Sequence, residues 1–162
     1  MKFFTYTLLL PLALIVSACT SISTLPDGAE QVSFELGKEG KTGWSEYQDS
    51  VFLRGVDART AYMAAKAGMG NAGFKVKVAD FENGVVKGEH GMTLVDWNIV
   101  AGAYIKETPE GTWVKVISEG SKDWGITGDD TAGAWPQEIL QGVRNYIRDE
   151  SLITDPNKGH FQ

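Results

Sequence analysis

Short stretches of alternating apolar and polar residues recur from residue 50 onward, and a period of two residues predicts β-strands. The stretches with strand character are residues 50–56, 74–78, 85–90, 98–106 and 112–118. In FKVKV, at 74–78, the three apolar residues fall on one face and the two lysines on the other. Asn83-Gly84 follows it, the dipeptide most typical of a tight hairpin, so residues 85–90 are expected to return antiparallel.

Two further segments repeat small or apolar residues at spacings of three and four, which predicts helices. Asp57 precedes the first as an N-cap, and residues 71–73 tolerate the left-handed backbone that ends a helix. One face of this helix carries only small residues, which allows close approach to a sheet: Ala58, Ala61, Ala65, Gly68 and Ala72. Pro136 suits the first turn of the second helix. Its apolar positions are Trp135, Ile139, Val143, Tyr146 and Ile147.

The element order is therefore strand, helix, four strands, helix. We expect an α+β domain with an antiparallel sheet of about four to five strands and two helices packed on one face, because this buries the apolar side of both layers. The predicted domain spans residues 48–150, and residues 151–162 are expected to be a flexible tail. Over about residues 50–149 this order resembles the helix-grip-like domains of small periplasmic lipoproteins, including some outer-membrane assembly factors. The resemblance assigns no functional residue.

The N-terminus has the organisation of an export signal. Lys2 supplies a positive charge, residues 8–16 are apolar, and small residues at 17–18 precede Cys19, the only cysteine of the chain. A membrane-spanning helix needs about 20 apolar residues, and this run is shorter and contains Pro11. A signal peptide is therefore the favoured interpretation.

Val16-Ser17-Ala18-Cys19 resembles the lipobox of bacterial lipoproteins, in which cleavage falls just before the cysteine. The resemblance implies a signal peptide over residues 1–18 and a Cys19 that carries three acyl chains on its thiol and amine, which together anchor a protein stably in a membrane. Thr20 stands where an aspartate would retain an enteric lipoprotein at the inner membrane. The resemblance therefore implies the periplasmic face of the outer membrane.

The residues between the anchor and the predicted domain are mostly small and polar. Because they include Pro26 and Gly28, residues 19–47 are expected to form the acylated cysteine and a tether that lets the domain stand off the bilayer. Within them, VSFEL at 32–36 alternates and is compatible with one short strand.

The charge of the chain narrows the range of partners. Fifteen Lys and Arg residues against 21 Asp and Glu residues give a net charge of −6. Removal of Lys2 with the signal peptide leaves 14 against 21, or −7. An acidic surface is repelled by phosphate backbones, so no nucleic-acid partner is expected.

No catalytic, cofactor or metal site is expected from the motifs present. GMGNAG, at 68–73, follows a predicted helix and precedes a strand, the reverse of the dinucleotide-binding arrangement, so its glycines are assigned to packing and capping. His90 lies beside Glu89, and Asp80 and Glu82 lie across the predicted turn. Zinc usually takes three or four protein ligands, so this group is interpreted as charged residues at a sheet edge.

One predicted connection, residues 119–135, is longer than most loops of compact domains and contains Trp124. We expect Trp124 to anchor a partner, with Asp123, Asp129 and Asp130 as a polar rim. The alternative is a solvated loop whose tryptophan folds back on the core. The leading hypothesis is a non-enzymatic outer-membrane lipoprotein that binds or scaffolds an envelope protein. Two other hypotheses are a carrier of a small apolar ligand or lipid between helix and sheet, and an enzyme on envelope polymers that pairs Asp123 with Asp129 or Asp130.

Overall fold

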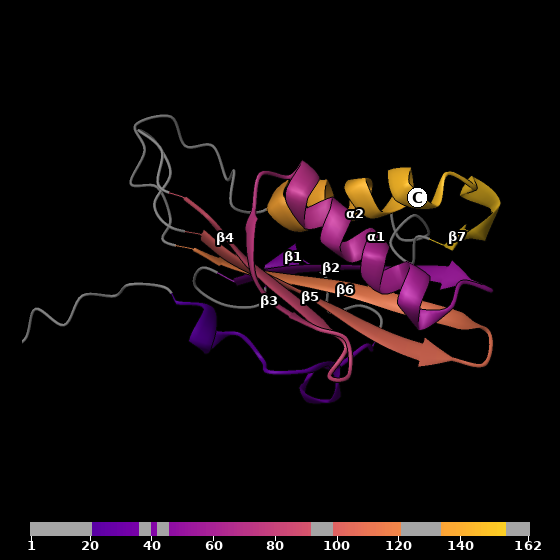
Figure 1. The fold of residues 1–162 in the computed structure, drawn as a ribbon, viewed down its shortest axis with the longest axis horizontal. Coiled ribbons are helices and arrows are strands. Elements are labelled where there is room, and N and C mark those ends of the chain that lie inside the picture. Colours follow the sequence, from indigo (N-terminus) through magenta and orange to yellow (C-terminus); the bar gives the residue numbers. More distant parts are fainter. Residues whose placement is uncertain (1–20, 36–39, 42–45, 92–98, 121–133, 155–162) are drawn as a thin grey trace, which may run out of the picture.

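The computed structural model describes residues 21–35, 40–41, 46–91, 99–120 and 134–154 (Figure 1). The helices are the 3-10 turns η1 (Ile22–Thr24), η2 (Ala29–Gln31) and η4 (Glu150–Leu152) and the α-helices α1 (Ala58–Asn71) and α2 (Ala134–Ile147). The strands are β1 (Gly40–Lys41), β2 (Glu46–Arg54), β3 (Lys75–Asp80), β4 (Val85–His90), β5 (Ile99–Thr108), β6 (Gly111–Gly120) and β7 (Ile153–Thr154). The predicted order of strand, helix, four strands and helix is confirmed, with the two-residue strands β1 and β7 added to it.

The strands form one antiparallel sheet in the order β1-β2-β6-β5-β4-β3, and β7 also pairs with β2. The chain is thus an α+β protein, as expected, and its five long strands are β2 to β6. β2 pairs with β6 over its whole length, from Glu46 opposite Glu119 to Arg54 opposite Gly111. It begins four residues before the predicted strand, so the folded part of the chain starts inside the segment expected to be a tether.

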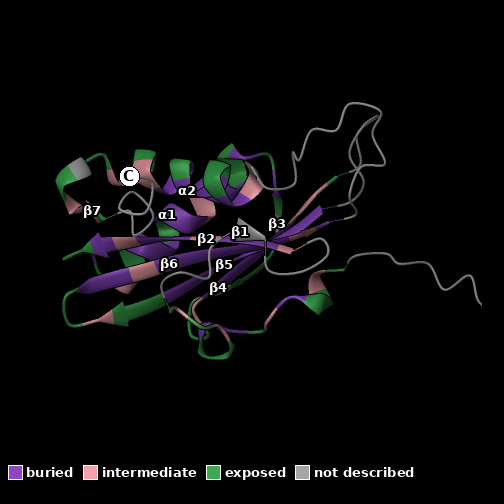
Figure 2. Cartoon of the chain, turned by 180° about the vertical axis from the view of Figure 1, so that it is seen from behind, coloured by how far each residue is buried: buried purple, intermediate pink, exposed green. Residues whose placement is uncertain are grey.

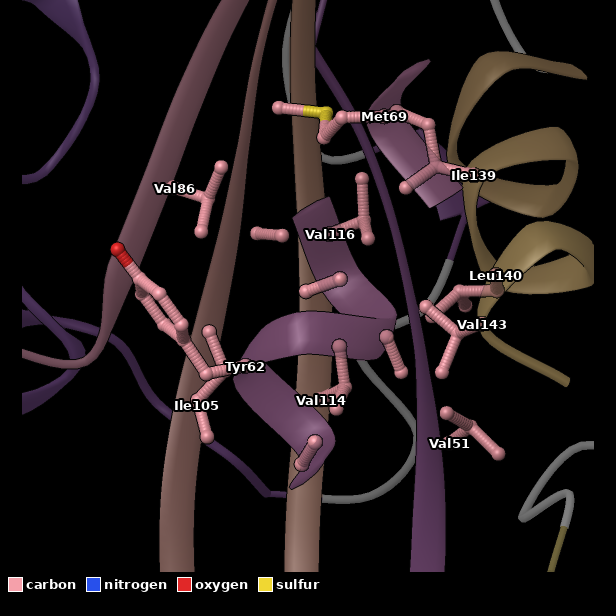
Figure 3. Close-up of a cluster of buried hydrophobic side chains, with 14 of the residues drawn as sticks. Val51, Tyr62, Met69, Val86, Ile105, Val114, Val116, Ile139, Leu140 and Val143 are labelled. Atoms are coloured by element: carbon pink, nitrogen blue, oxygen red, sulfur yellow. The ribbon is translucent and has the colours of Figure 1, made fainter. Parts of the chain in front are cut away.

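Both α-helices lie on one face of the sheet, as predicted (Figure 1). Their buried side chains meet alternate residues of the strands, because every second residue of a strand points to the same face. Ten residues of this first core are labelled in Figure 3: Val51, Tyr62, Met69, Val86, Ile105, Val114, Val116, Ile139, Leu140 and Val143. Tyr146, expected on the apolar face of α2, is instead 46% exposed.

The two helices touch through glycine. A Cβ on Gly142 of α2 would lie 2.6 Å from the Cα of Gly68 in α1, and a Cβ on Gly68 would run into the carbonyl oxygen of Ile139. The small-residue stripe of α1 therefore serves the contact with α2 as well as the sheet. Gly73, which ends the GMGNAG motif, has a φ of +81° at the C-terminus of α1. The predicted packing role is therefore confirmed at Gly68 and the capping role at Gly73, whereas a Cβ on Gly70 would meet nothing.

Residues 21–35, which we call the strap, are packed on the other face of the sheet, so the tether prediction is wrong for them (Figure 1). Leu25 is 2% exposed and Ala29 is 6% exposed. The apolar side chains of the strap pack against strand residues that point away from the helices: Val85, Val100, Tyr104 and Ile117. Figure 2 shows the strands largely buried between the two layers. Pro26 and Gly28 are typical of a linker, but the strap also carries enough apolar side chains to cover a face of the sheet.

The segments just before and just after the predicted domain also differ from expectation. The strand proposed for residues 32–36 is absent from its described part, since Val32 follows η2 and residues 33–35 have no regular structure. The tail proposed for residues 151–162 is ordered up to Thr154, because Leu152 and Ile153 pack against the first core and β7 pairs with β2.

Within the described ranges, none of the helices has the length and apolar content of a bilayer-crossing segment.

The glycine contact between the helices predicts opposite effects of one substitution at two sites of α1. Gly68→Ala should destabilise the fold by about 1–3 kcal/mol, because the new methyl group overpacks the contact with α2. Gly70→Ala is the matched control: its Cβ would meet nothing within 4 Å, and alanine should stabilise the helix by up to about 1 kcal/mol. Urea unfolding of the two variants measures both values. Equal effects would show that α1 and α2 are not in close contact.

Candidate functional site: a pocket beneath the strap

Two sites singled out in the sequence fall outside the described residues: Cys19, Asp123, Trp124, Asp129 and Asp130. The roles expected of these residues therefore stay predictions. The structure does describe residues that lie next to both sites along the chain. The described chain begins at Ser21, two residues after Cys19, and β6 ends at Gly120, so the first two residues of the connection predicted for 119–135 belong to this strand.

Three buried side chains of the sheet donate hydrogen bonds to backbone carbonyls of the strap. They come from three neighbouring strands, β4, β5 and β6, so the strap is held at separate points across the sheet. The bonds run from Lys87 Nζ to Leu25 O (3.1 Å), from Tyr104 Oη to Pro26 O (3.0 Å) and from Lys115 Nζ to Ser33 O (2.8 Å). A chain segment with its carbonyls fixed in this way is part of the fold.

The two lysines are unusually buried for their type. Lys87 is 3% exposed and Lys115 is 1% exposed. Lys87 Nζ also donates to Asp27 Oδ1 at 2.9 Å, but the Asp27 side chain is 85% exposed, so solvent screens this ion pair and it contributes little. A buried ammonium group without partners costs several kcal/mol. The carbonyls of the strap therefore satisfy charges that the strap itself removes from water.

Tyr104 is fully buried between the strap and the sheet. Burial raises the pKa of its hydroxyl far above the ordinary value, and the nearby charges of Glu119 and Asp27 raise it further. The hydroxyl consequently stays protonated at every physiological pH, and the bond to Pro26 O is available throughout.

A pocket of about 330 Å³ opens where the strap meets the β3–β4 turn. Its walls come from the strap, the turn, the start of α1 and the end of β5. The lining residues are Asp27, Gly28, Ala29, Glu30, Gln31, Ala58, Phe81, Glu82, Asn83, Gly84, Ile105 and Glu107. Four of these are carboxylates, and none carries a hydroxyl, thiol or imidazole group.

The β3–β4 turn forms the floor of the pocket. The predicted Asn83-Gly84 turn is confirmed: Gly84 has a φ of +59°, which suits glycine, and its carbonyl accepts from the amide of Ile105 at 2.8 Å. Asn83 accepts from the amide of Ala29 at 2.9 Å and so joins the turn to the strap. The Asn83 side chain, and to a smaller extent its backbone amide, donate hydrogen bonds to Asp80 and lower the pKa of its carboxyl group. Asp80 therefore stays ionised, and keeps these bonds, to a lower pH than an ordinary aspartate.

The N-terminus of α1 forms one rim of the pocket. Glu107 Oε1 accepts from the amide of Ala58 at 3.2 Å, so this carboxylate caps the helix as well as lining the pocket. Phe81 is 41% exposed, with the guanidinium of Arg59 5.0 Å from its ring centre and the ring of Tyr62 edge-on at 5.3 Å. The rim thus presents an accessible aromatic surface beside the carboxylates.

The group proposed around His90 is not assembled. Lys75 pairs with Glu89 at one end of the β3–β4 hairpin, whereas Asp80 pairs with Val85 at the other, so the four side chains lie at opposite ends. Among the described residues, no three His, Cys, Asp or Glu side chains could hold a metal ion together.

His90 belongs to an aromatic cluster instead. Its ring centre is 4.5 Å from that of Trp135 and 5.5 Å from that of Phe74. His90 Nδ1 and Trp135 Nε1 are both buried without a hydrogen-bond partner. This cluster caps one end of the first core, where β4 ends and α2 begins.

No family model matches this chain, and comparison with curated proteins gave no match. Among solved structures, one described as the crystal structure of Ara h 8.0201 aligns with 64% of this chain and 97% of its own, at 10% sequence identity and a TM-score of 0.36. This level of likeness says nothing about what the present chain binds.

Sequence reasoning missed the pocket and the strap. The available signal was the spacing of apolar residues between Cys19 and β2: Ile22, Leu25, Ala29, Val32 and Phe34. A second signal was the apolar character of both faces of the strands, for example Val85 beside Val86, because a sheet that is apolar on both faces needs a cover on both.

Removing the Tyr104 hydroxyl should weaken the fold without disturbing its core. Tyr104→Phe keeps the ring and leaves the Pro26 carbonyl without its donor, so the free energy of unfolding should fall by about 1 kcal/mol. Tyr146→Phe is the matched control: Tyr146 is exposed, so this substitution should alter the free energy of unfolding by no more than about 0.5 kcal/mol. Denaturant unfolding compares the two, and a Tyr104→Phe value as small as the control would show that the strap is not held at this point.

Proposed function

We propose that this protein is a lipoprotein of the outer membrane, facing the periplasm, whose α+β domain is a binding or scaffold module without catalytic activity. The proposal rests on the residues before the fold: a positive start, an apolar run and Val16-Ser17-Ala18-Cys19, with Thr20 after the cysteine. The acyl chains on Cys19 supply the anchor.

The structural observation that supports this function best is the docked strap. Only Thr20 lies between Cys19 and the first strap residue, Ser21. The strap is then fixed to the sheet by carbonyl bonds to Lys87, Tyr104 and Lys115. The chain that leaves the anchor is therefore built into the domain, which suits a module whose task is to hold a partner at a membrane.

A ligand carrier is the second candidate, and the structure indicates where its ligand would enter. The space between helices and sheet is filled, since Ala61, Ala65 and Met69 are fully buried there. The pocket beneath the strap, at about 330 Å³, lies at the lower end of the size range of small-molecule sites. Native mass spectrometry of the delipidated domain distinguishes the two functions, because a co-purifying small molecule would favour the carrier.

Cys19→Ala tests the anchor. The variant should accumulate as an unprocessed or soluble species and should incorporate no labelled palmitate, whereas the natural sequence fractionates with the outer membrane. Recovery of a processed Cys19→Ala protein that is still tightly bound to the membrane would contradict the lipoprotein assignment.

Trp124→Ala tests the predicted partner surface. If residues 119–135 bind a partner through Trp124, with Asp123, Asp129 and Asp130 around it, in-cell cross-linking to that partner should be lost while the melting temperature stays nearly unchanged. Tyr146→Ala, which removes another exposed aromatic side chain, is the control and should leave capture intact. Intact capture by Trp124→Ala would refute this surface, and a large drop in stability would place Trp124 in the core.

A further inference from the structure

The strap defines which end of the domain lies nearest to Cys19. Thr24 donates its hydroxyl to Glu119 Oε2, close to the end of β6. Glu119 lies in a row of paired residues that crosses the five long strands at this end: Lys75, Glu89, Val100, Glu119 and Glu46. We call this row the anchor end. β3, β5 and β2 begin near it, and β4 and β6 finish near it.

The length of chain between the lipid and the fold is very short. Cys19 and Ser21 are two residues apart, and two residues span at most about 7 Å even when fully extended. A Cys19 whose acyl chains are in the bilayer therefore holds Ser21 at the headgroups. Because the strap is bonded to the sheet from Thr24 onward, the anchor end must lie close to the same surface.

The pocket lies toward the opposite end of the sheet. From Val100 at the anchor end to Thr108 at the end of β5 there are eight residue steps, or about 27 Å at the rise of an antiparallel strand. The pocket residues Ile105 and Glu107 lie in the distal part of this length.

On the basis of the proposed lipidation, we infer that the docked strap orients the domain on the membrane. The anchor end is the end of the domain nearest to the phospholipid headgroups, and the pocket is held on the side away from them. The strap is thus a rigid coupling between the lipid anchor and the domain.

Fluorescence quenching on vesicles tests this orientation. The acylated thiol of Cys19 cannot react with a dye, so a single introduced cysteine is labelled specifically. Lys75→Cys places the dye in the anchor-end row, and Glu110→Cys places it in the β5–β6 turn at the far end; both positions are exposed. The full acylated protein is reconstituted into vesicles of phosphatidylethanolamine and phosphatidylglycerol that contain a headgroup quencher.

We expect quenching at position 75 to be several-fold stronger than at position 110. Equal quenching, or stronger quenching at position 110, in protein that carries labelled palmitate would overturn the orientation and leave the lipoprotein assignment intact. Protein without palmitate would overturn the assignment, and the orientation with it.

A linker variant tests whether the strap is the cause. A glycine–serine insertion of about 20 residues between Thr20 and Ser21 has an average span near 25 Å, enough to release the domain from the surface. Quenching at position 75 should then fall to the level at position 110. Unchanged quenching at position 75 would show that the anchor end binds lipid by itself, and would overturn the coupling through the strap.

Discussion

Bonds from buried side chains to the strap carbonyls hold residues 21–35, the first segment of the described chain, in place. Lys87, Tyr104 and Lys115 project from neighbouring strands on the face of the sheet that the helices leave open. Each would be a polar group on an apolar surface without the strap, and each finds a carbonyl once the strap is docked. The apolar burial of Leu25 and Ala29 and the satisfaction of these donors therefore depend on one another.

The remaining features follow from this contact. The docked strap gives the domain three layers, with helices on one face of the sheet and the strap on the other (Figure 1). It supplies one wall of the pocket, whose other walls are fixed by the Asn83-Gly84 turn and by the cap that Glu107 places on α1. It also joins the fold to the segment that carries Cys19. A domain whose residues 21–35 formed a flexible tether would have neither this pocket nor a defined end next to Cys19.

The sequence predicted those elements that depend on local pattern. The strand at FKVKV, the Asn83-Gly84 turn and the small-residue stripe of α1 are each decided within about ten residues, and all three are present. The strict alternation expected in FKVKV is wrong at its end, because a bulge between Val76 and Val78 breaks the register and leaves Val78 exposed. Local pattern could not predict the strap, because the side chains that bond to its carbonyls lie more than sixty residues away along the chain. The start of β2 at Glu46 and the pairing of β7 also depend on contacts with distant strands. The pocket was missed for the same reason, since its walls come from four separate segments, and the predicted loop site around Trp124 lies outside the described residues.

Amide hydrogen exchange of Ala29 tests the central claim most directly. This amide donates to the carbonyl of Asn83 at 2.9 Å, and the residue is 6% exposed, so it reports on docking of the strap alone. The account predicts that, in the folded protein, the Ala29 amide exchanges far more slowly than in an unstructured peptide, with protection approaching that of neighbouring β5 amides. Exchange at the rate of an unstructured peptide, with β5 fully protected, would mean that the strap is a free tether and would contradict the account.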